Sequence, residues 1–294
     1  MRWEGNRQSD NVEDRRSEGY SGGGGGMLGG RTIGIGTIVI ALVAWGVFGI
    51  NPLTTIGVLS GGGGSPAVQQ QQGPAQKPPA SDQQAAFVST VLANTEDVWS
   101  QVFQQAGARY VAPKLVLYRG ATPTACGTGQ SAMGPFYCPQ DQKVYLDMGF
   151  FDTMQRQLGA PGEFARAYVI AHEVGHHVQN LQGLTDKVDS LRGRVSQAQQ
   201  NALSVRLELQ ADCYAGIWAN KSQQAKNWLE QGDIESAMNA AHQIGDDTLQ
   251  KEHQGYVVPD SFTHGSSAQR QRWFMQGYQS GSVKSCDTFS SQNI

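Results

Sequence analysis

Two histidines four positions apart are the residues whose types and spacing most clearly suggest chemistry. The segment 168–183, YVIAHEVGHHVQNLQG, holds three of the six histidines of the chain and one glutamate among largely apolar neighbours. On a helix, His172 and His176 share one face, so both imidazoles can reach one metal ion. Glu173 is then a candidate general base, whereas His177 is rotated by about 100 degrees from His176 and should point elsewhere. The alternative is a set of histidines satisfied within a core.

A pair of acidic residues in a later segment could complete the site. Glu208 and Asp212 lie one helical turn apart in VRLELQADCYAGIW (205–218), which is otherwise mostly apolar. Burying two carboxylates on such a face is costly without a cation or strong hydrogen bonds, and Zn²⁺ would supply the cation. Glu208 would complete a His2Glu ligand set with the fourth position open to water, as in catalytic zinc sites. Asp212 would accept a hydrogen bond from a ligand imidazole. The alternative is a solvated acidic helix face.

These motifs resemble those of known zinc peptidases. HEVGHH followed by ELQADC resembles the gluzincin class, with HExxH and a downstream ExxxD. It departs from the metzincins, because Gln179 and Gln182 stand where that class has a glycine and a third histidine. More specifically, the chain resembles the YpfJ-like family of bacterial neutral zinc metallopeptidases in RWEGNRQSDNVEDRR, YCPQDQKVYLD, AYVIAHEVGHHVQ, LSVRLELQADCYAG and VPDSFTHGSSAQR. The resemblance implies zinc peptidase activity and a zincin-like (gluzincin) domain.

A third segment, SFTHGSSAQRQRWF (261–274), supplies two more candidates. It places His264 in a turn before a helix that serine can cap. The order of elements also resembles the membrane CAAX-protease group, in which a histidine followed six positions later by arginine occupies a similar place. His264 and Arg270 match it, with glycine in place of that group's usual proline. We expect His264 to donate a hydrogen bond to the developing oxyanion and Arg270 to orient the loop. The alternative is a surface histidine in a polar loop.

A helix-rich α+β domain over residues 81–294 is expected to position these side chains. The spacing of apolar residues predicts a helix over 81–107, and KLVLY (114–118) predicts a strand. Alternation predicts a second strand at Val144–Met148, which we expect to be an edge strand that aligns the substrate by strand addition. Further helices are expected at 151–158, along the HExxH motif up to Gly183, and at 186–201, 203–225, 233–250 and 266–279.

An uncharged run of 19 residues, Thr32–Ile50, predicts a single transmembrane helix before this domain. Arginines precede the run, and no Lys or Arg follows it until Lys77, so the N-terminus is expected in the cytoplasm and the domain in the periplasm, anchored in the bacterial inner membrane. Residues 1–31 are expected to be a disordered tail and 51–80 a Gly/Gln/Pro-rich linker. The alternatives are a buried core helix or a cleaved signal peptide.

Cysteine count and net charge limit the remaining possibilities. The four cysteines all follow the apolar run, which in an oxidising compartment suggests two disulfides. Three pairings exist, and we favour Cys126–Cys138, which closes a short loop, and therefore Cys213–Cys286; the alternative is reduced, structural cysteines. A formal charge of −3 gives no basic surplus for phosphates, so nucleic acid is not an expected partner.

The sequence thus predicts a membrane-anchored zinc metallopeptidase that hydrolyses peptide bonds in a peptide or protein substrate. Zinc held by His172, His176 and Glu208 would activate water, and Glu173 would act as general base. A second hypothesis is a zinc-binding periplasmic scaffold or assembly factor without turnover. A third is a metal-free helical binding module.

Overall fold

The computed structural model describes residues 1–18, 76–131, 134–292 and 294. Its main sheet has the strand order β1-β2-β6-β5, formed by Val12–Asp14, Lys114–Tyr118, Lys143–Asp147 and Phe136–Cys138. β1, β2 and β6 run parallel, and β5 is antiparallel to β6. β3 (Ala121–Thr124) and β4 (Gly127–Gln130) form a separate hairpin. The strands at 114–118 and near 144–148 are confirmed.

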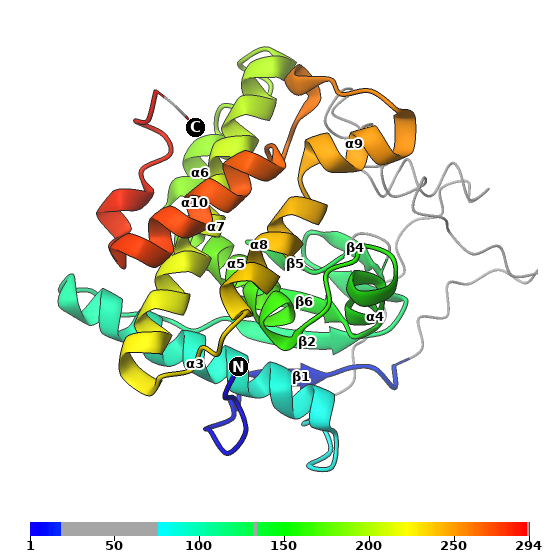
Figure 1. Cartoon of the computed structure of the whole chain (residues 1–294), viewed down its shortest axis with the longest axis vertical. Helices are drawn as coiled ribbons and strands as arrows, with labels where there is room; N and C mark the ends of the chain where they lie inside the picture. The colour runs from blue at the N-terminus through cyan, green and yellow to red at the C-terminus, as the bar shows by residue number, and fades with distance from the viewer. Residues whose placement is uncertain (19–75, 132–133, 293) are drawn as a thin grey trace, which may run out of the picture.

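The helices lie beside this sheet (Figure 1). Their bounds are α3 Gln83–Gln105, α4 Gly149–Arg156, α5 Glu163–Leu181, α6 Leu184–Asp189, α7 Gln197–Lys226, α8 Asp233–Gln243, α9 Asp246–Gln254 and α10 Ser267–Ser280, with short 3-10 turns η2 Pro259–Ser261 and η3 Val283–Cys286. α5 is central, because it packs against α3, α7 and α8 and against β5 and β6. The helix-rich α+β architecture is therefore confirmed, and its core surrounds the helix that carries the HExxH motif.

Two helix boundaries differ from the sequence prediction. The segment expected to be one helix at 186–201 contains the end of α6, then a non-helical stretch, then the first turn of α7. A capping box at Ser196 starts α7. The expected helix at 233–250 is broken between α8 and α9 at Gly245. A Cβ on Gly245 would lie 2.5 Å from the backbone nitrogen of Ser267. The helix is therefore interrupted where Gly245 packs closely against the start of α10. This contact between distant segments cannot be seen in the local sequence.

Close backbone contacts also set the position of α7. A Cβ at Gly216 would meet the carbonyl oxygen of Phe274 at 2.1 Å, and one at Gly277 would meet that of Cys213 at 1.9 Å. Glycine at both positions lets α7 and α10 approach closely. The disulfide Cys213–Cys286 ties the turn after α10 to the same helix, and Cys126–Cys138 ties the β3–β4 turn to β5. Both favoured pairings are present.

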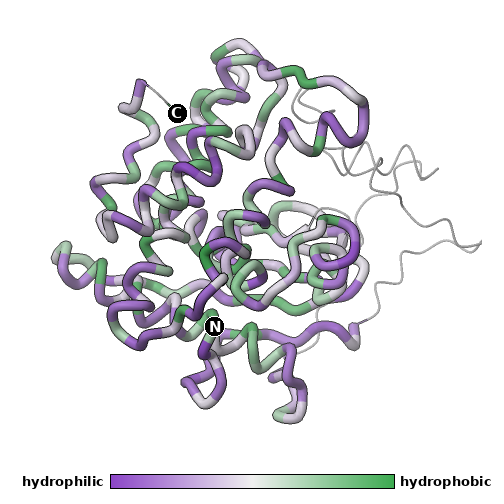
Figure 2. Tube along the Cα trace, viewed as in Figure 1, coloured by the Kyte–Doolittle hydropathy of each residue, from purple (hydrophilic) through white to green (hydrophobic). Residues whose placement is uncertain are grey.

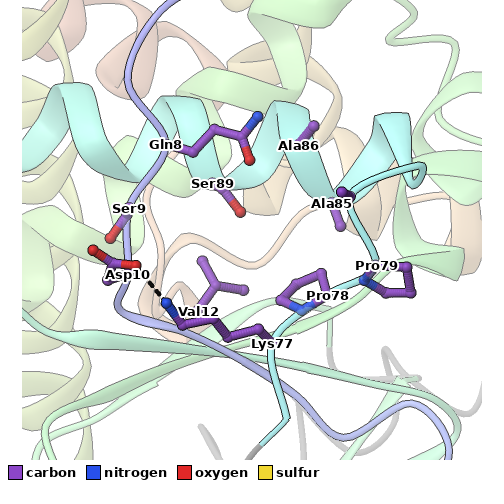
Figure 3. Close-up of a pocket in the computed structure, with 11 residues that line it drawn as sticks. Gln8, Ser9, Asp10, Val12, Lys77, Pro78, Pro79, Ala85, Ala86 and Ser89 are labelled. Atoms are coloured by element: carbon purple, nitrogen blue, oxygen red, sulfur yellow. Dashed lines mark hydrogen bonds and ion pairs between the residues drawn. The ribbon is translucent and has the colours of Figure 1, made fainter.

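The N-terminal residues 1–18, expected to be a disordered tail, form part of the domain. β1 pairs with β2 in register from Val12 opposite Leu115. The Trp3 ring packs edge-on against Phe87 of α3 with centroids 5.4 Å apart. A small pocket lies between this segment, the residues that follow Gln76, and α3 (Figure 3). These contacts overturn the expected tail for the residues that the structure describes.

The predicted membrane topology is also wrong. Among the described residues, no helix is long and apolar enough to cross a bilayer, and polar and apolar residues alternate along the helices (Figure 2). The run Thr32–Ile50 itself lies outside the described residues. A single crossing there would place residues 1–18 and 76–294 on opposite sides, yet β1 and β2 share one sheet. The fold class is corrected to the helix-rich α+β domain alone, and the single-pass location and lipid partner are withdrawn.

Candidate metal centre

The site lies where α5 and α7 cross. Gly175, between the two motif histidines, faces α7, and a Cβ there would lie 3.0 Å from the carbonyl oxygen and 3.1 Å from the Cα of Ala211. The helical glycine therefore serves close helix packing, which offsets its cost of about 1 kcal/mol relative to alanine. This approach brings Glu208, on α7, opposite His172 and His176 on α5.

The three candidate ligands converge as the sequence predicted. The Nε2 atoms of His172 and His176 are 3.2 Å apart, and the carboxylate oxygens of Glu208 lie 3.1 Å from the first and 3.4 Å from the second. A tetrahedral zinc with ligand bonds of about 2.0–2.1 Å separates its ligand atoms by about 3.3 Å. The donor set and its spacing therefore fit zinc.

Hydrogen bonds at the other ring nitrogens direct both imidazoles. Asp212 accepts from Nδ1 of His172 at 2.8 Å, as predicted, and the side-chain oxygen of Gln179 lies 2.9 Å from Nδ1 of His176. With Nδ1 protonated on each ring, both Nε2 lone pairs point toward the shared site. Gln179 entered the sequence argument only as a departure from the metzincin pattern.

A buried network surrounds Asp212, whose side chain is fully inaccessible. Arg270 donates from Nε to Oδ2 at 2.9 Å and from Nη2 to Oδ1 at 3.0 Å, and Tyr168 donates its hydroxyl to Oδ1 at 2.6 Å. Burial alone would raise the pKa of Asp212, but Arg270 and His172 hold it below the usual range. Arg270 was expected to orient the His264 loop; its bidentate contact is with Asp212, and Nη1 reaches the carbonyl of Ile244. Tyr168 was not predicted.

Glu173 and the candidate ligand His172 are buried, and the candidate ligand His176 is partly buried. Burial is the largest influence on the pKa of Glu173 and raises it, with the negative charge of Glu208 acting in the same direction. Burial alone would lower the pKa of His172, yet Asp212 and Glu208 raise it to about 10. The negative potential that produces this shift is the one that favours a bound cation.

His264 is held by Asp246, a residue that the sequence analysis missed. The carboxylate of Asp246 accepts from the backbone N–H groups of Thr263, His264 and Gly265 at 2.7–2.9 Å and faces Nδ1 of His264 at 3.2 Å. Burial opposes a raised pKa at His264, but Asp246 and Glu208 together raise it. The loop itself lies against α7, because a Cβ on Gly265 would lie 3.1 Å from the Leu209 side chain, one residue after Glu208. Because the sequence predicted one helix over 233–250, Asp246 fell in its interior and no sequence signal singled it out.

His177 points away from the metal site, as its rotation on the helix predicts. It is fully buried, with Nε2 at 2.6 Å from the carbonyl of Val111 and Nδ1 at 2.9 Å from the hydroxyl of Tyr137. Since a carbonyl only accepts, Nε2 carries the proton and Nδ1 accepts from Tyr137. Burial lowers the pKa of His177 to about 4, so the ring is neutral and serves to join α5 to β5.

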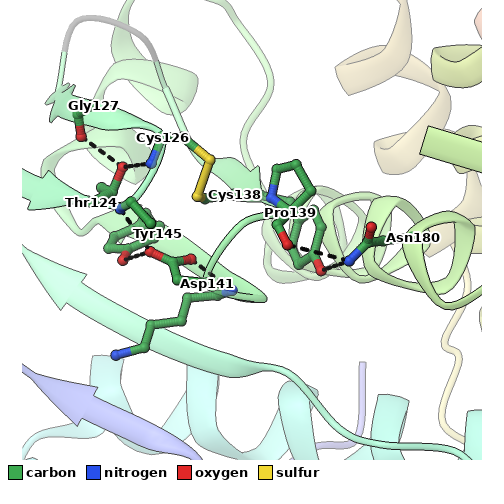
Figure 4. The surroundings of a disulfide bond; sticks show 11 residues. Thr124, Cys126, Gly127, Cys138, Pro139, Asp141, Tyr145 and Asn180 are labelled. Atoms are coloured by element: carbon green, nitrogen blue, oxygen red, sulfur yellow. Dashed lines mark hydrogen bonds between the residues drawn. A yellow bond between two sulfur atoms is a disulfide. The ribbon is translucent and has the colours of Figure 1, made fainter. Parts of the chain in front are cut away.

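Within the described part of the sheet, β5 and β1 are the outer strands, and the strand at 144–148 is not an edge strand. β6 pairs with β2 on one side and with β5 on the other, so it lies inside the sheet. Asn180 of α5 donates to the hydroxyl of Tyr137 at 3.0 Å, and the disulfide at Cys138 secures the end of the strand (Figure 4). The alternation in β6 indicated a strand but contained no information about its neighbours.

Comparison with known proteins agrees with this site. Residues 1–289 match the family described as "Putative neutral zinc metallopeptidase". The chain belongs to this family. It is 53% identical over 292 residues to "Uncharacterized protein YpfJ" of Escherichia coli strain K12, which covers 98% of this chain and 99% of that protein. It is 44% identical over 197 residues to an uncharacterized protein of Mycobacterium tuberculosis strain H37Rv, covering 63% of this chain and 65% of that one. No solved structure matches it significantly.

Membership of this family indicates the cofactor and the class of substrate. The family implies Zn²⁺, and among the described residues the grouping that could hold it is His172, His176 and Glu208. A peptidase family also indicates a peptide or protein substrate.

Proposed function

We propose that this protein hydrolyses peptide bonds at a zinc ion held by His172, His176 and Glu208, with Glu173 as general base. The observation that carries the proposal is the convergence of three side chains: the two Nε2 atoms are 3.2 Å apart, and each lies 3.1–3.4 Å from a different carboxylate oxygen of Glu208, a spacing close to that of zinc ligands. When bound there, zinc supplies the Lewis acidity that makes a water molecule nucleophilic near neutral pH.

The side chains of the chain perform the proton transfers. Glu173 follows the first ligand and is buried beside the site, so its carboxylate takes a proton from the attacking water and delivers it to the leaving amine. Without a bound metal, burial raises the pKa of Glu173, the direction that favours acceptance of a proton. Asp212 and Gln179 keep the ligand rings in orientation during this exchange.

His264 is proposed as the donor to the attacked carbonyl oxygen. Its Nδ1 faces Asp246, so the charge on that carboxylate favours the imidazolium and leaves Nε2–H available. Negative charge develops on the carbonyl oxygen only as the bond to water forms, so the hydrogen bond strengthens in the transition state. Asp246 acts through His264 and is a positioning residue.

β5 is proposed to align the substrate. Within the described part of the chain, its outer edge carries no paired strand, and Tyr137 on β5 contacts the metal-bearing helix through His177. An extended peptide added to this edge would form main-chain hydrogen bonds with β5, which packs against the helix α5 that carries the HExxH motif.

The test uses the purified full chain and measures bound zinc and hydrolysis of casein or a peptide library separately. The wild type should hold one zinc and lose hydrolysis on chelation. His176→Ala and Glu208→Ala should lose zinc, whereas Glu173→Gln should keep zinc and lose hydrolysis. The exposed His242 on α8 gives a matched control, because His242→Ala should change neither. Full hydrolysis by Glu173→Gln would refute the mechanism. Zinc without chelator-sensitive cleavage would favour the scaffold hypothesis.

A further inference from the structure

We infer that Gln179 and Gln210 position the metal-side nitrogen of His176, and that the Cys213–Cys286 disulfide fixes the far end of this hydrogen-bonded chain. The inference rests on the proposed zinc site and concerns how one ligand of that site is aligned. His172 is aligned by the charged Asp212, but the acceptor at His176 is a neutral amide.

The chain of contacts is continuous and buried. The side-chain nitrogen of Gln179 donates to the carbonyl of Leu207 at 2.7 Å and to the side-chain oxygen of Gln210 at 3.0 Å. The side-chain nitrogen of Gln210 donates in turn to the carbonyl of Cys286 at 3.0 Å. Gln179 is 1% exposed and Gln210 is 5% exposed. Water is therefore a poor substitute partner for either amide.

The two backbone carbonyls fix the direction of every hydrogen bond. A carbonyl only accepts, so the carbonyl of Cys286 requires the NH2 group of Gln210, whose oxygen must then face Gln179. That oxygen and the carbonyl of Leu207 both require the NH2 group of Gln179. The oxygen of Gln179 therefore faces His176, whose Nδ1 must be the donor. This leaves Nε2 of His176 unprotonated and directed at the site when the ring is neutral.

The disulfide holds the last acceptor in place. Cys286 belongs to η3, far from α7 in sequence, and its bond to Cys213 joins it to α7 one residue after Asp212. Both cysteines are fully buried. The carbonyl of Cys286 also accepts from the backbone of Thr288, whose hydroxyl donates to the carbonyl of Arg206 on α7. The segment after α10 thus acts as a fixed support for His176.

Zinc affinity tests the glutamines directly. Gln179→Met and Gln210→Met keep most of the side-chain length and remove both hydrogen-bonding groups. Each should weaken zinc binding to the full chain by about 10- to 100-fold, the usual effect of losing such a supporting residue. The measurement is competition with a chromophoric chelator, and the cobalt(II)-substituted protein reports ligand geometry through its visible spectrum.

A buried amide away from the site provides the control for stability. Asn94 on α3 accepts hydrogen bonds from Trp218 and Ser222 of α7. Asn94→Ala should lower the melting temperature but leave zinc affinity and the cobalt spectrum as in the wild type. If Asn94→Ala weakens zinc as much as the glutamine variants, the effect is general loosening and the inference is overturned.

Removing each disulfide in turn tests whether the Cys213–Cys286 bond supports His176 specifically or whether any cross-link in the domain has the same effect on zinc binding. Replacing both Cys213 and Cys286 by Ser should weaken zinc binding, and adding Gln210→Met should have little further effect because both changes interrupt one chain. Replacing both Cys126 and Cys138 by Ser should leave zinc affinity unchanged.

The outcomes distinguish this inference from the proposed function. Wild-type zinc affinity in Gln179→Met, together with loss of zinc in His176→Ala, would overturn the inference and leave the metal site standing. Full zinc retention by His176→Ala would overturn both.

Discussion

Removing the charge of Arg270 should destabilise the domain strongly, although Arg270 is not a proposed metal ligand. Arg270→Met keeps a long apolar side chain and removes the guanidinium that makes two hydrogen bonds with Asp212. Asp212 is fully buried and Arg270 is 3% exposed. The carboxylate would keep only Tyr168 and His172 as donors, and in the metal-free state the imidazolium of His172, whose pKa is raised to about 10, would be its remaining positive partner.

The structure gives the size of the effect. At 2.9 Å and an effective dielectric constant of about 20, two unit charges attract by about 6 kcal/mol. Desolvation of both ions offsets part of this attraction, and breaking a buried pair by removing one partner typically costs about 3–5 kcal/mol. For a domain of this size, each kcal/mol lowers the melting temperature by about 2–4 °C, so a fall of about 6–20 °C is expected.

The assay is denaturant unfolding of the wild type, Arg270→Met, Asp212→Asn and the double variant, in the metal-free state. Asn at position 212 can still accept from Tyr168 and His172 through its carbonyl oxygen, but it leaves no buried negative charge. The double variant should therefore be more stable than Arg270→Met alone. A cost below about 1 kcal/mol for Arg270→Met, or strictly additive single effects, would show that the pair is not coupled as the geometry requires.

Two further predictions concern the loop and the N-terminal strand. His264→Ala should retain zinc while turnover falls by about 100- to 1,000-fold, and Asp246→Asn should cause a smaller fall; wild-type turnover in His264→Ala would make this histidine a plain loop residue. Burial would raise the pKa of Glu13, but its ion pairs with Lys143 and Lys114 hold it below the usual value. The ionised Glu13 therefore stabilises the docking of residues 1–18 fully at pH values above its pKa in the unfolded chain. This stabilisation is lost as the pH falls through its lower pKa in the folded protein. Protection of the β1 amides, measured by hydrogen exchange and corrected for the intrinsic pH dependence of exchange, should fall in acid, and Glu13→Gln should flatten that dependence. An unchanged pH profile in the variant would assign the docking to other contacts.

The local part of the site could be predicted because the chemistry follows helix periodicity. His172 and His176 on one face, and Glu208 one turn before Asp212, are properties of short segments. The partner of Arg270 could not be predicted in the same way. Its contact with Asp212 spans 58 positions and depends on how closely α10 approaches α7 through Gly216 and Gly277. Spacing therefore identified the candidate ligands, whereas packing determines which residues contact them.

The edge of the sheet shows the same limit. Alternation identified β6 correctly, because the period of two is a property of one strand. Edge position depends on which strands pair, and the short β5 adds to the outer side of β6 by an antiparallel contact. A three-residue strand such as Phe136–Cys138 carries too little pattern to be found from sequence. The surface proposed to meet the substrate therefore moved to residues that the sequence analysis did not single out as a strand.

The topological error has a specific electrostatic cause. The rule that places positive residues in the cytoplasm assumes charges in loops that face solvent. Here Arg7 pairs with Glu96 and Asp97 of α3, and Arg16 bridges Asp14 and Asp82. These arginines balance acidic residues of the same folded domain, so their excess before Thr32 contains no information about orientation. The backbone N–H of Asp14 also donates to the carbonyl of Gln76 at 2.7 Å, so the chain rejoins the domain beside β1. The residues before Thr32 were therefore interpreted as a free tail, although Val12–Asp14 form a strand paired with β2.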